Sequence, residues 1–102
     1  MQAKELAKRL KAKNPPTTVD VRSKFEFRGG HIPGAIHAPM WKILCRQTKL
    51  PADKNAELVL TCEHGPRAQM AHGLLGMLGY RNVVLLEGHM SGWRRAGFET
   101  VK

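Results

Sequence analysis

The stretch that decides the fold is Leu58-Val59-Leu60-Thr61, followed directly by Cys62-Glu63-His64-Gly65-Pro66-Arg67-Ala68. The first four residues are an apolar run that predicts a buried strand over 58–61. The segment after the loop is rich in glycine and leucine and predicts a helix over 68–79. Cys62 therefore stands at the end of a strand, in a tight loop that leads into the first turn of a helix.

A cysteine at this position is placed where a thiolate is stabilised. The first amides of a helix have no partners within the helix, and the helix dipole adds partial positive charge at the same end. The thiolate is the reactive form of cysteine. We therefore expect Cys62 to be a nucleophile, rather than only a buried cysteine at a strand end.

On both sides of this stretch, strand and helix patterns alternate along the chain. We expect strands over 17–21, around Ile36 and over 83–86, and helices over 3–13, 23–27, 41–47 and 91–96. Ser23 and Glu26 have the spacing of a capping box. Such alternation predicts an α/β fold with a small parallel sheet and helices on both faces, in which ligands bind at the carboxyl ends of the strands.

The expected helix after the loop carries a glycine at every third position, namely Gly73, Gly76 and Gly79. Glycine inside a helix costs about 1 kcal/mol relative to alanine. We therefore expect Gly73 and Gly76 to allow close packing against the sheet. Gly79 is better placed to end the helix.

The length and the net charge of the chain limit the classes of function that it can have. The 102 residues suit one domain, and no apolar run approaches a membrane span. Since no secretory signal is visible, we expect a cytoplasmic protein; whether this is a whole protein or a domain of a larger one stays open. The net charge of +9 favours anionic small substrates or acidic protein partners. Nucleic acid is disfavoured, because no basic cluster is interleaved with aromatic residues.

Cysteine usage is sparse. The two cysteines, Cys45 and Cys62, are too few for a disulfide scaffold, and no cysteine and histidine pair has zinc-finger spacing. We expect no metal and no cofactor. Cys45 is expected to be a small buried hydrophobic residue, although the two cysteines could also pair in space.

At this point the chain resembles the rhodanese-like sulfurtransferase family. The resemblance rests on several short motifs that occur in the family's order and spacing and together cover nearly the whole chain. They are Val19-Asp20-Val21-Arg22, Glu26-Phe27, Gly30-His31-Ile32-Pro33-Gly34-Ala35-Ile36, Cys62-x-x-Gly65-x-Arg67, Leu78-Gly79-Tyr80-Arg81-Asn82-Val83, and Leu86-Glu87-Gly88 followed by Trp93.

The resemblance implies a single rhodanese-like domain over 1–102 that works as a ping-pong sulfur carrier. Cys62 would take a sulfane sulfur from a small anionic donor such as thiosulfate or a persulfide. The resulting persulfide would pass its sulfur to cyanide or a thiol, and thioredoxin or another sulfur-carrier protein is a possible partner. Neither nucleic acid nor membrane is expected as a partner of this chain.

The loop residues Glu63, His64, Gly65, Pro66 and Arg67 are expected to bind the substrate, mainly through backbone amides that form a nest for an anion. The side chain of Arg67 can bind the donor. It can equally be structural, paired with a carboxylate such as Asp20 or Glu87. Further structural residues are expected to be Asp20, Arg22 and His31 in neighbouring loops, and Trp41 and Trp93 in the core or a pocket wall.

Three residues depart from the family pattern. Ala68 stands where relatives often have a hydroxyl group, and His89 replaces a second glycine, which leaves the conformation of its loop open. Glu63 places a negative charge beside Cys62 and is expected to repel thiosulfate unless Arg67 or His64 offsets it. A protein persulfide is then a possible donor.

Two other functions are weighed against sulfur transfer. Some members of this family are non-catalytic modules for regulation or protein interaction, but these commonly lack the cysteine. Related phosphatases and arsenate reductases carry one more residue in the loop, whereas only 63–66 separate Cys62 from Arg67 here. The shorter loop favours sulfur chemistry.

Overall fold

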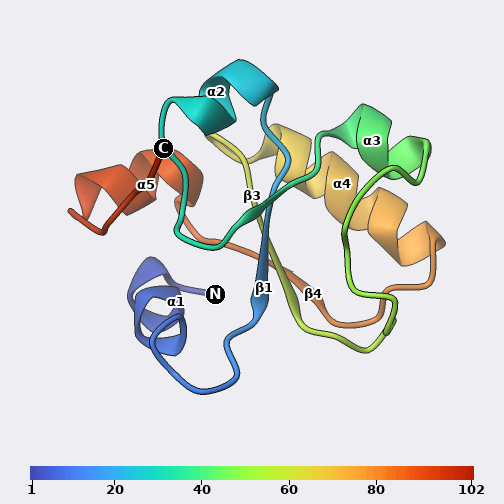
Figure 1. The fold of residues 1–102 in the computed structure, drawn as a ribbon, viewed down its shortest axis with the longest axis horizontal. Helices are drawn as coiled ribbons and strands as arrows, with labels where there is room; N and C mark the ends of the chain where they lie inside the picture. The colour runs from blue at the N-terminus through green and yellow to red at the C-terminus, as the bar shows by residue number, and fades with distance from the viewer.

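Four parallel strands form one sheet in the order β2-β1-β3-β4. The computed structural model describes residues 1–102, and Figure 1 shows its arrangement. The strands are β1 (Thr17–Asp20), β2 (Ile36–His37), β3 (Leu58–Thr61) and β4 (Val83–Leu85). Because all the strands are parallel, their carboxyl ends meet at one edge of the sheet.

Five helices surround this sheet: α1 (Ala3–Arg9), α2 (Lys24–Arg28), α3 (Met40–Leu44), α4 (Pro66–Met77) and α5 (His89–Arg95). Helices α1 and α5 lie on one side of the strands and α3 and α4 on the other, while α2 lies beyond the carboxyl end of β1 (Figure 1). The predicted α/β architecture with helices on both faces is confirmed. None of the helices combines the length and hydrophobicity needed to cross a membrane.

The core has one part on each face of the sheet. Side chains alternate along β3, so that Leu58 and Leu60 face one side and Val59 the other. The first side also buries Val19, Val21, Ala38, Ile43, Cys62, Ala68, Ala71 and Leu75. The second buries Leu6, Ile32, Leu86, Met90 and Trp93. The candidate nucleophile Cys62 is thus anchored among core residues.

The element boundaries follow packing more closely than periodicity. Helix α1 ends at Arg9 instead of continuing to Lys13, because residues 11–13 are exposed and have no core to pack against. Helix α4 begins two residues earlier than predicted, with Pro66 in its first turn. The capping box of α2 is confirmed, with Ser23 accepting from the backbone of Glu26 and Glu26 accepting in return.

The glycines of α4 do not face the sheet. Gly73 and Gly76 are exposed, and a Cβ added at either would meet no heavy atom within 4 Å. The prediction of close packing at these positions is therefore wrong. Alanine side chains and Leu75 form the buried face of α4 instead. Gly79 ends the helical segment as predicted, with a φ of 98° that suits glycine.

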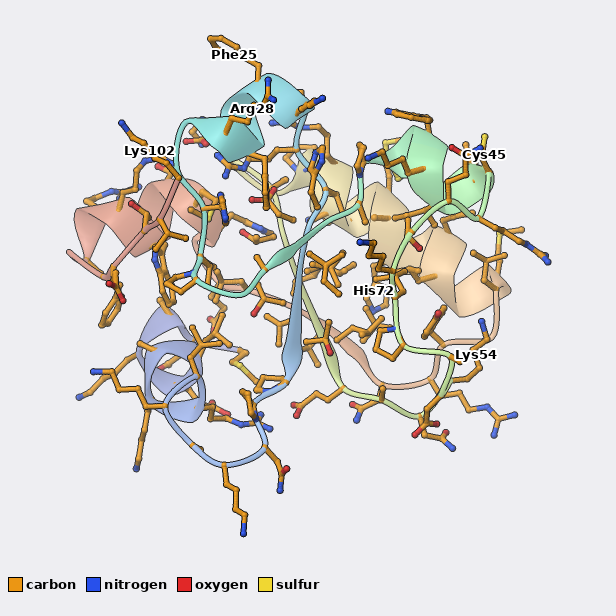
Figure 2. The ribbon with its side chains drawn as sticks, viewed as in Figure 1. Phe25, Arg28, Cys45, Lys54, His72 and Lys102 are labelled. Carbon is orange, nitrogen blue, oxygen red and sulfur yellow. The ribbon has the colours of Figure 1, made fainter.

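The prediction that Cys45 is buried is also wrong. Cys45 is exposed and lies after the last turn of α3, on the outer side of the molecule (Figure 2). Cys62 is buried, and both thiols are free. The amphipathic face of α3 directs Ile43 inward, which leaves the end of this short helix in solvent.

Candidate active site

The candidate site is the loop of residues 62–65 between β3 and α4. Cys62 is only 1% exposed, and its Sγ accepts a hydrogen bond of 2.9 Å from the backbone N–H of Gly65. Gly65 has a φ of 128°, which glycine adopts readily, and Pro66 follows where its missing N–H breaks no helical bond. The loop thereby places the thiol at the N-terminus of a helix of 12 residues.

Two arginines hold the carboxylate of Glu63. Arg94 of α5 forms an ion pair with it, and Nη1 of Arg22 lies 3.4 Å from its Oε1. The sequence pointed to Arg67 and His64 as the cations that offset Glu63, but His64 is exposed and Arg67 has another partner. Arg94 is therefore a site residue that sequence reasoning missed, because nothing in the helix pattern of α5 indicates which loop it faces.

Arg67 pairs with Glu26 of α2, and not with Asp20 or Glu87 as predicted for a structural arginine. Its two terminal nitrogens donate to the two carboxylate oxygens of Glu26 over 2.6 and 2.9 Å. The capping box with Ser23 holds Glu26 in place. The hydrogen bond from Arg67 lowers the pKa of Glu26 to about 2, and the same bond raises the pKa of Arg67. The pair links α2 to the first turn of α4.

Asp20 is unavailable to Arg67 because Arg22 occupies it. Both side chains are buried, at 0% and 3% exposure, and Arg22 donates to both carboxylate oxygens of Asp20. Arg22 also donates to the carbonyl of Gly30 over 2.8 Å. The pair ties the end of β1 to the turn before β2, which confirms the predicted role of these residues in holding neighbouring loops.

Two histidines near this edge are structural. His31 stacks on Phe27 with ring centroids 3.7 Å apart, and its Nδ1 lies 2.8 Å from the Phe27 carbonyl. His37 stacks on the same ring, and its Nε2 lies 2.7 Å from the carbonyl of Arg22. The structural interpretation of His31 is confirmed.

A cleft of about 590 Å³ opens next to Arg67, between α2, α3 and the ends of β1 and β2. Lys24, Lys42 and Arg67 give it positive charge, and no carboxylate lines it. The remaining lining residues are Val21, Ser23, His37, Pro39, Met40 and Trp41. Trp41 therefore forms part of a pocket wall while Trp93 is in the core, as the sequence predicted. The cleft suits an anionic ligand.

His89 is the second residue whose place at the site the sequence did not reveal. It begins α5 with a φ of 51°, and its imidazole is buried beside the loop. The backbone N–H of Cys62 donates to its Nδ1 over 3.3 Å, and its Nε2 packs against Gly65. The available signal is topological, because the turn after β4 lies at the same sheet edge as the loop after β3.

Comparison with known proteins agrees with this geometry. A family model described as Rhodanese-like domain matches residues 2–96. The chain belongs to the rhodanese-like domain family.

The relatives of this rhodanese-like domain include sulfurtransferases. It is 32% identical over 101 residues to a sulfurtransferase of Allochromatium vinosum, covering 99% of this chain and 92% of that protein. It is 33% identical over 92 residues to the thiosulfate sulfurtransferase GlpE of Pseudomonas aeruginosa, covering 90% and 81%. It is 31% identical over 75 residues to the putative sulfur carrier protein YrkF of Bacillus subtilis, covering 74% of this chain and only 40% of that longer protein.

A solved structure shares the fold. The crystal structure of a rhodanese-related protein from Thermoplasma volcanium is 31% identical, with a TM-score of 0.83, and the match covers 99% of this chain and 95% of that one.

Within the rhodanese-like domain described here, Ala68 is fully buried in the core beside Cys62. Its methyl group offers no hydrogen bond to the thiol, and the hydrogen bond that Sγ accepts comes from the backbone N–H of Gly65.

Proposed function

We propose that this rhodanese-like domain is a sulfurtransferase that carries sulfane sulfur as a persulfide on Cys62. One observation carries the proposal: the Sγ of Cys62 accepts a hydrogen bond from Gly65 at the N-terminus of α4. A thiolate or a persulfide anion at this position is stabilised by the same amides. The sulfurtransferases among the relatives support this class of reaction.

In the first half of the proposed reaction, the Cys62 thiolate attacks the outer sulfur of a donor such as thiosulfate. A bond forms between Sγ and that sulfur, the sulfur–sulfur bond of the donor breaks, and sulfite leaves with the electron pair. The donor is anionic, and the cleft is lined by Lys24, Lys42 and Arg67 and by no carboxylate, while Arg67 itself pairs with Glu26. We infer that Arg67 and the two cleft lysines attract the donor.

In the second half, a nucleophile attacks the outer sulfur of the Cys62 persulfide. Cyanide leaves as thiocyanate, and a thiol acceptor becomes a persulfide; in both cases the electron pair of the broken bond returns to Sγ. The thiolate is thereby regenerated, and no external oxidant or reductant is needed. Thioredoxin or another sulfur-carrier protein is a proposed acceptor in place of a small thiol.

The charge of Glu63 bears on the choice of donor. Because Arg22 and Arg94 pair with this carboxylate, its repulsion of an approaching anion is reduced. We propose that thiosulfate and a persulfide both load Cys62. A donor panel in which only one of the two donor types loads Cys62 would contradict this proposal.

The experiment is a sulfur-transfer assay on three proteins: wild type, Cys62→Ser and Cys45→Ser. Thiosulfate or glutathione persulfide serves as donor and cyanide as acceptor, and thiocyanate is measured. We expect Cys62→Ser to abolish transfer with the fold intact, and Cys45→Ser to retain it, since Cys45 is exposed on the outer side of α3. No transfer by the wild type from either donor would favour a non-catalytic interaction module. Hydrolysis of an aryl phosphate that depends on Cys62 would favour a phosphatase.

A further inference from the structure

His89 is the first residue of α5, directly after the turn that follows β4, and the residue is 8% exposed. The side chain contacts the Cys62 loop at two points. Its Nδ1 accepts the backbone N–H of Cys62 over 3.3 Å. Its Nε2 would lie 3.1 Å from a Cβ built on Gly65, the residue whose own N–H donates to Sγ. The ring therefore spans the loop from the residue that bears the thiol to the residue that stabilises it.

The backbone of His89 adopts a conformation that is uncommon for residues other than glycine. Its φ is 51°, in the left-handed region, and it follows Gly88 at 77°. Glycine takes this region without steric conflict, whereas a side chain pays a conformational cost there. A strained residue persists where the surroundings hold it, and such residues gather at functional sites. The contacts of the imidazole offset the conformational cost of the positive φ at His89.

The hydrogen bond fixes the protonation of the ring. A backbone N–H can only donate, so Nδ1 must be an acceptor and the proton of the neutral ring must lie on Nε2. Burial lowers the pKa of His89, and the nearby His64 lowers it further. Both effects keep the imidazole neutral near pH 7. Without this acceptor, the buried N–H of Cys62 would lack a partner.

We propose that His89 is a positioning residue for the Cys62 nucleophile: its neutral imidazole anchors the Cys62 amide and packs against Gly65, so that the Gly65 N–H stays directed at Sγ. The inference rests on the proposed function in taking Cys62 Sγ as the reacting atom. His89 acts through the loop and not through contact with the substrate. Loss of the acceptor lets the loop relax, which weakens the stabilisation of the thiolate.

The test compares His89→Gly with His89→Asn in a Cys45→Ser background, which leaves Cys62 as the only thiol. Glycine fits the backbone conformation and removes the acceptor, whereas asparagine tolerates a positive φ and carries Oδ1 on its γ-carbon, as histidine carries Nδ1. The readout is the rate of Cys62 alkylation by iodoacetamide as a function of pH. This reaction requires the thiolate but no sulfur donor.

We expect His89→Gly to slow alkylation at pH 7 by roughly three- to tenfold, the range for losing one hydrogen bond, and to move the pH profile to higher pH. His89→Asn should stay within about twofold of the background protein. Alkylation by His89→Gly at the background rate would overturn the proposal. Equal slowing in both variants would also overturn it, because space filling alone would then explain the effect.

A second measurement needs no variant at His89. The imidazole nitrogen signals in an NMR spectrum of the wild type at pH 7 report which ring nitrogen carries the proton. We expect the proton of His89 on Nε2 and a slowly exchanging amide at Cys62. A proton on Nδ1, or a doubly protonated ring, would overturn the proposal. Neither readout depends on sulfur transfer, so failure of the proposed function and failure of this inference are distinguishable.

Discussion

Two arginine–carboxylate pairs flank the Cys62 loop, and they differ mainly in burial. Arg22 and Asp20 are 3% and 0% exposed, and Arg22 also binds the Gly30 carbonyl. Arg67 and Glu26 are 42% and 30% exposed and border the cationic cleft. The first pair joins residues two positions apart and is sealed from water, whereas the second joins residues 41 positions apart and stays partly in solvent.

The difference in burial indicates that the two pairs have different roles. A buried pair that loses one partner leaves an uncompensated charge in the interior, whereas an exposed pair contributes about 0–1 kcal/mol because water screens it. We therefore infer that the Arg22–Asp20 pair stabilises the fold, whereas the Arg67–Glu26 pair acts mainly at the cationic cleft, where the donor is expected to bind.

The largest effect is expected at the buried pair. Arg22→Met strands the buried carboxylate of Asp20 and should lower the free energy of unfolding by about 3–5 kcal/mol. Urea denaturation with the two-state analysis measures it. The matched control is Arg67→Met, which should cost no more than about 1 kcal/mol. Similar losses in the two variants would remove the distinction between the pairs.

The second prediction concerns activity at the exposed pair. Arg67→Met should slow persulfide formation from thiosulfate by about ten- to a hundredfold, the range for losing one charge-assisted hydrogen bond. Arg67→Lys keeps the charge but loses the planar, bidentate geometry, so it should fall between Met and the wild type. Stopped-flow or quenched mass spectrometry provides the rate. An unchanged rate in Arg67→Met would make this arginine purely structural.

The third prediction is a pH dependence. Arg67 lowers the pKa of Glu26 from 4.5 to about 2. A carboxyl with a lowered folded-state pKa adds stability that is present above the unfolded pKa and is lost as the pH falls through the folded value. The Glu26 contribution should therefore disappear between pH 4.5 and about pH 2.

Glu26→Gln tests this dependence, because glutamine can keep the capping box while removing the charge. Its unfolding free energy should vary less than that of the wild type across this interval, by about 1 kcal/mol or less because the pair is partly exposed. Parallel pH curves for the two proteins would show that the ion pair contributes nothing to stability.

The smallest effect is expected at Gly76, which lies on α4, the helix that also carries Arg67. Gly76→Ala adds a methyl group that meets no atom within 4 Å, so it should raise the free energy of unfolding by about 0.5–1 kcal/mol through helix propensity alone. Thermal unfolding detects such a shift. A loss of stability would mean that α4 packs more closely at this point than its exposed face indicates.

The sequence predicted the parts of the site that depend on local pattern. The strand over 58–61, the turn into α4 and the capping box of Ser23 are encoded by neighbouring residues, and each is found in the structure. The Gly65 amide was also among the expected loop donors. These features need only short-range sterics and the end effects of a helix.

The sequence could not predict which side chains contact one another at the edge of the sheet where the strands end. The partner of Arg67 was misassigned because Asp20 is already occupied by Arg22, a choice that only the packed structure shows. The contact between His89 and the Cys62 amide joins residues 27 positions apart. Residue type alone predicts that Cys45 is buried, whereas the end of a short helix leaves it in solvent.

The central claim is that Cys62 carries sulfur, and the intact mass of the protein tests it most directly. Wild type, Cys45→Ser and Cys62→Ser are each incubated with thiosulfate or glutathione persulfide and then with cyanide. We expect a gain of one sulfur, about 32 Da, in the first two proteins, its removal by cyanide, and no gain in Cys62→Ser. No gain in the wild type from either donor, or an equal gain in Cys62→Ser, would contradict it.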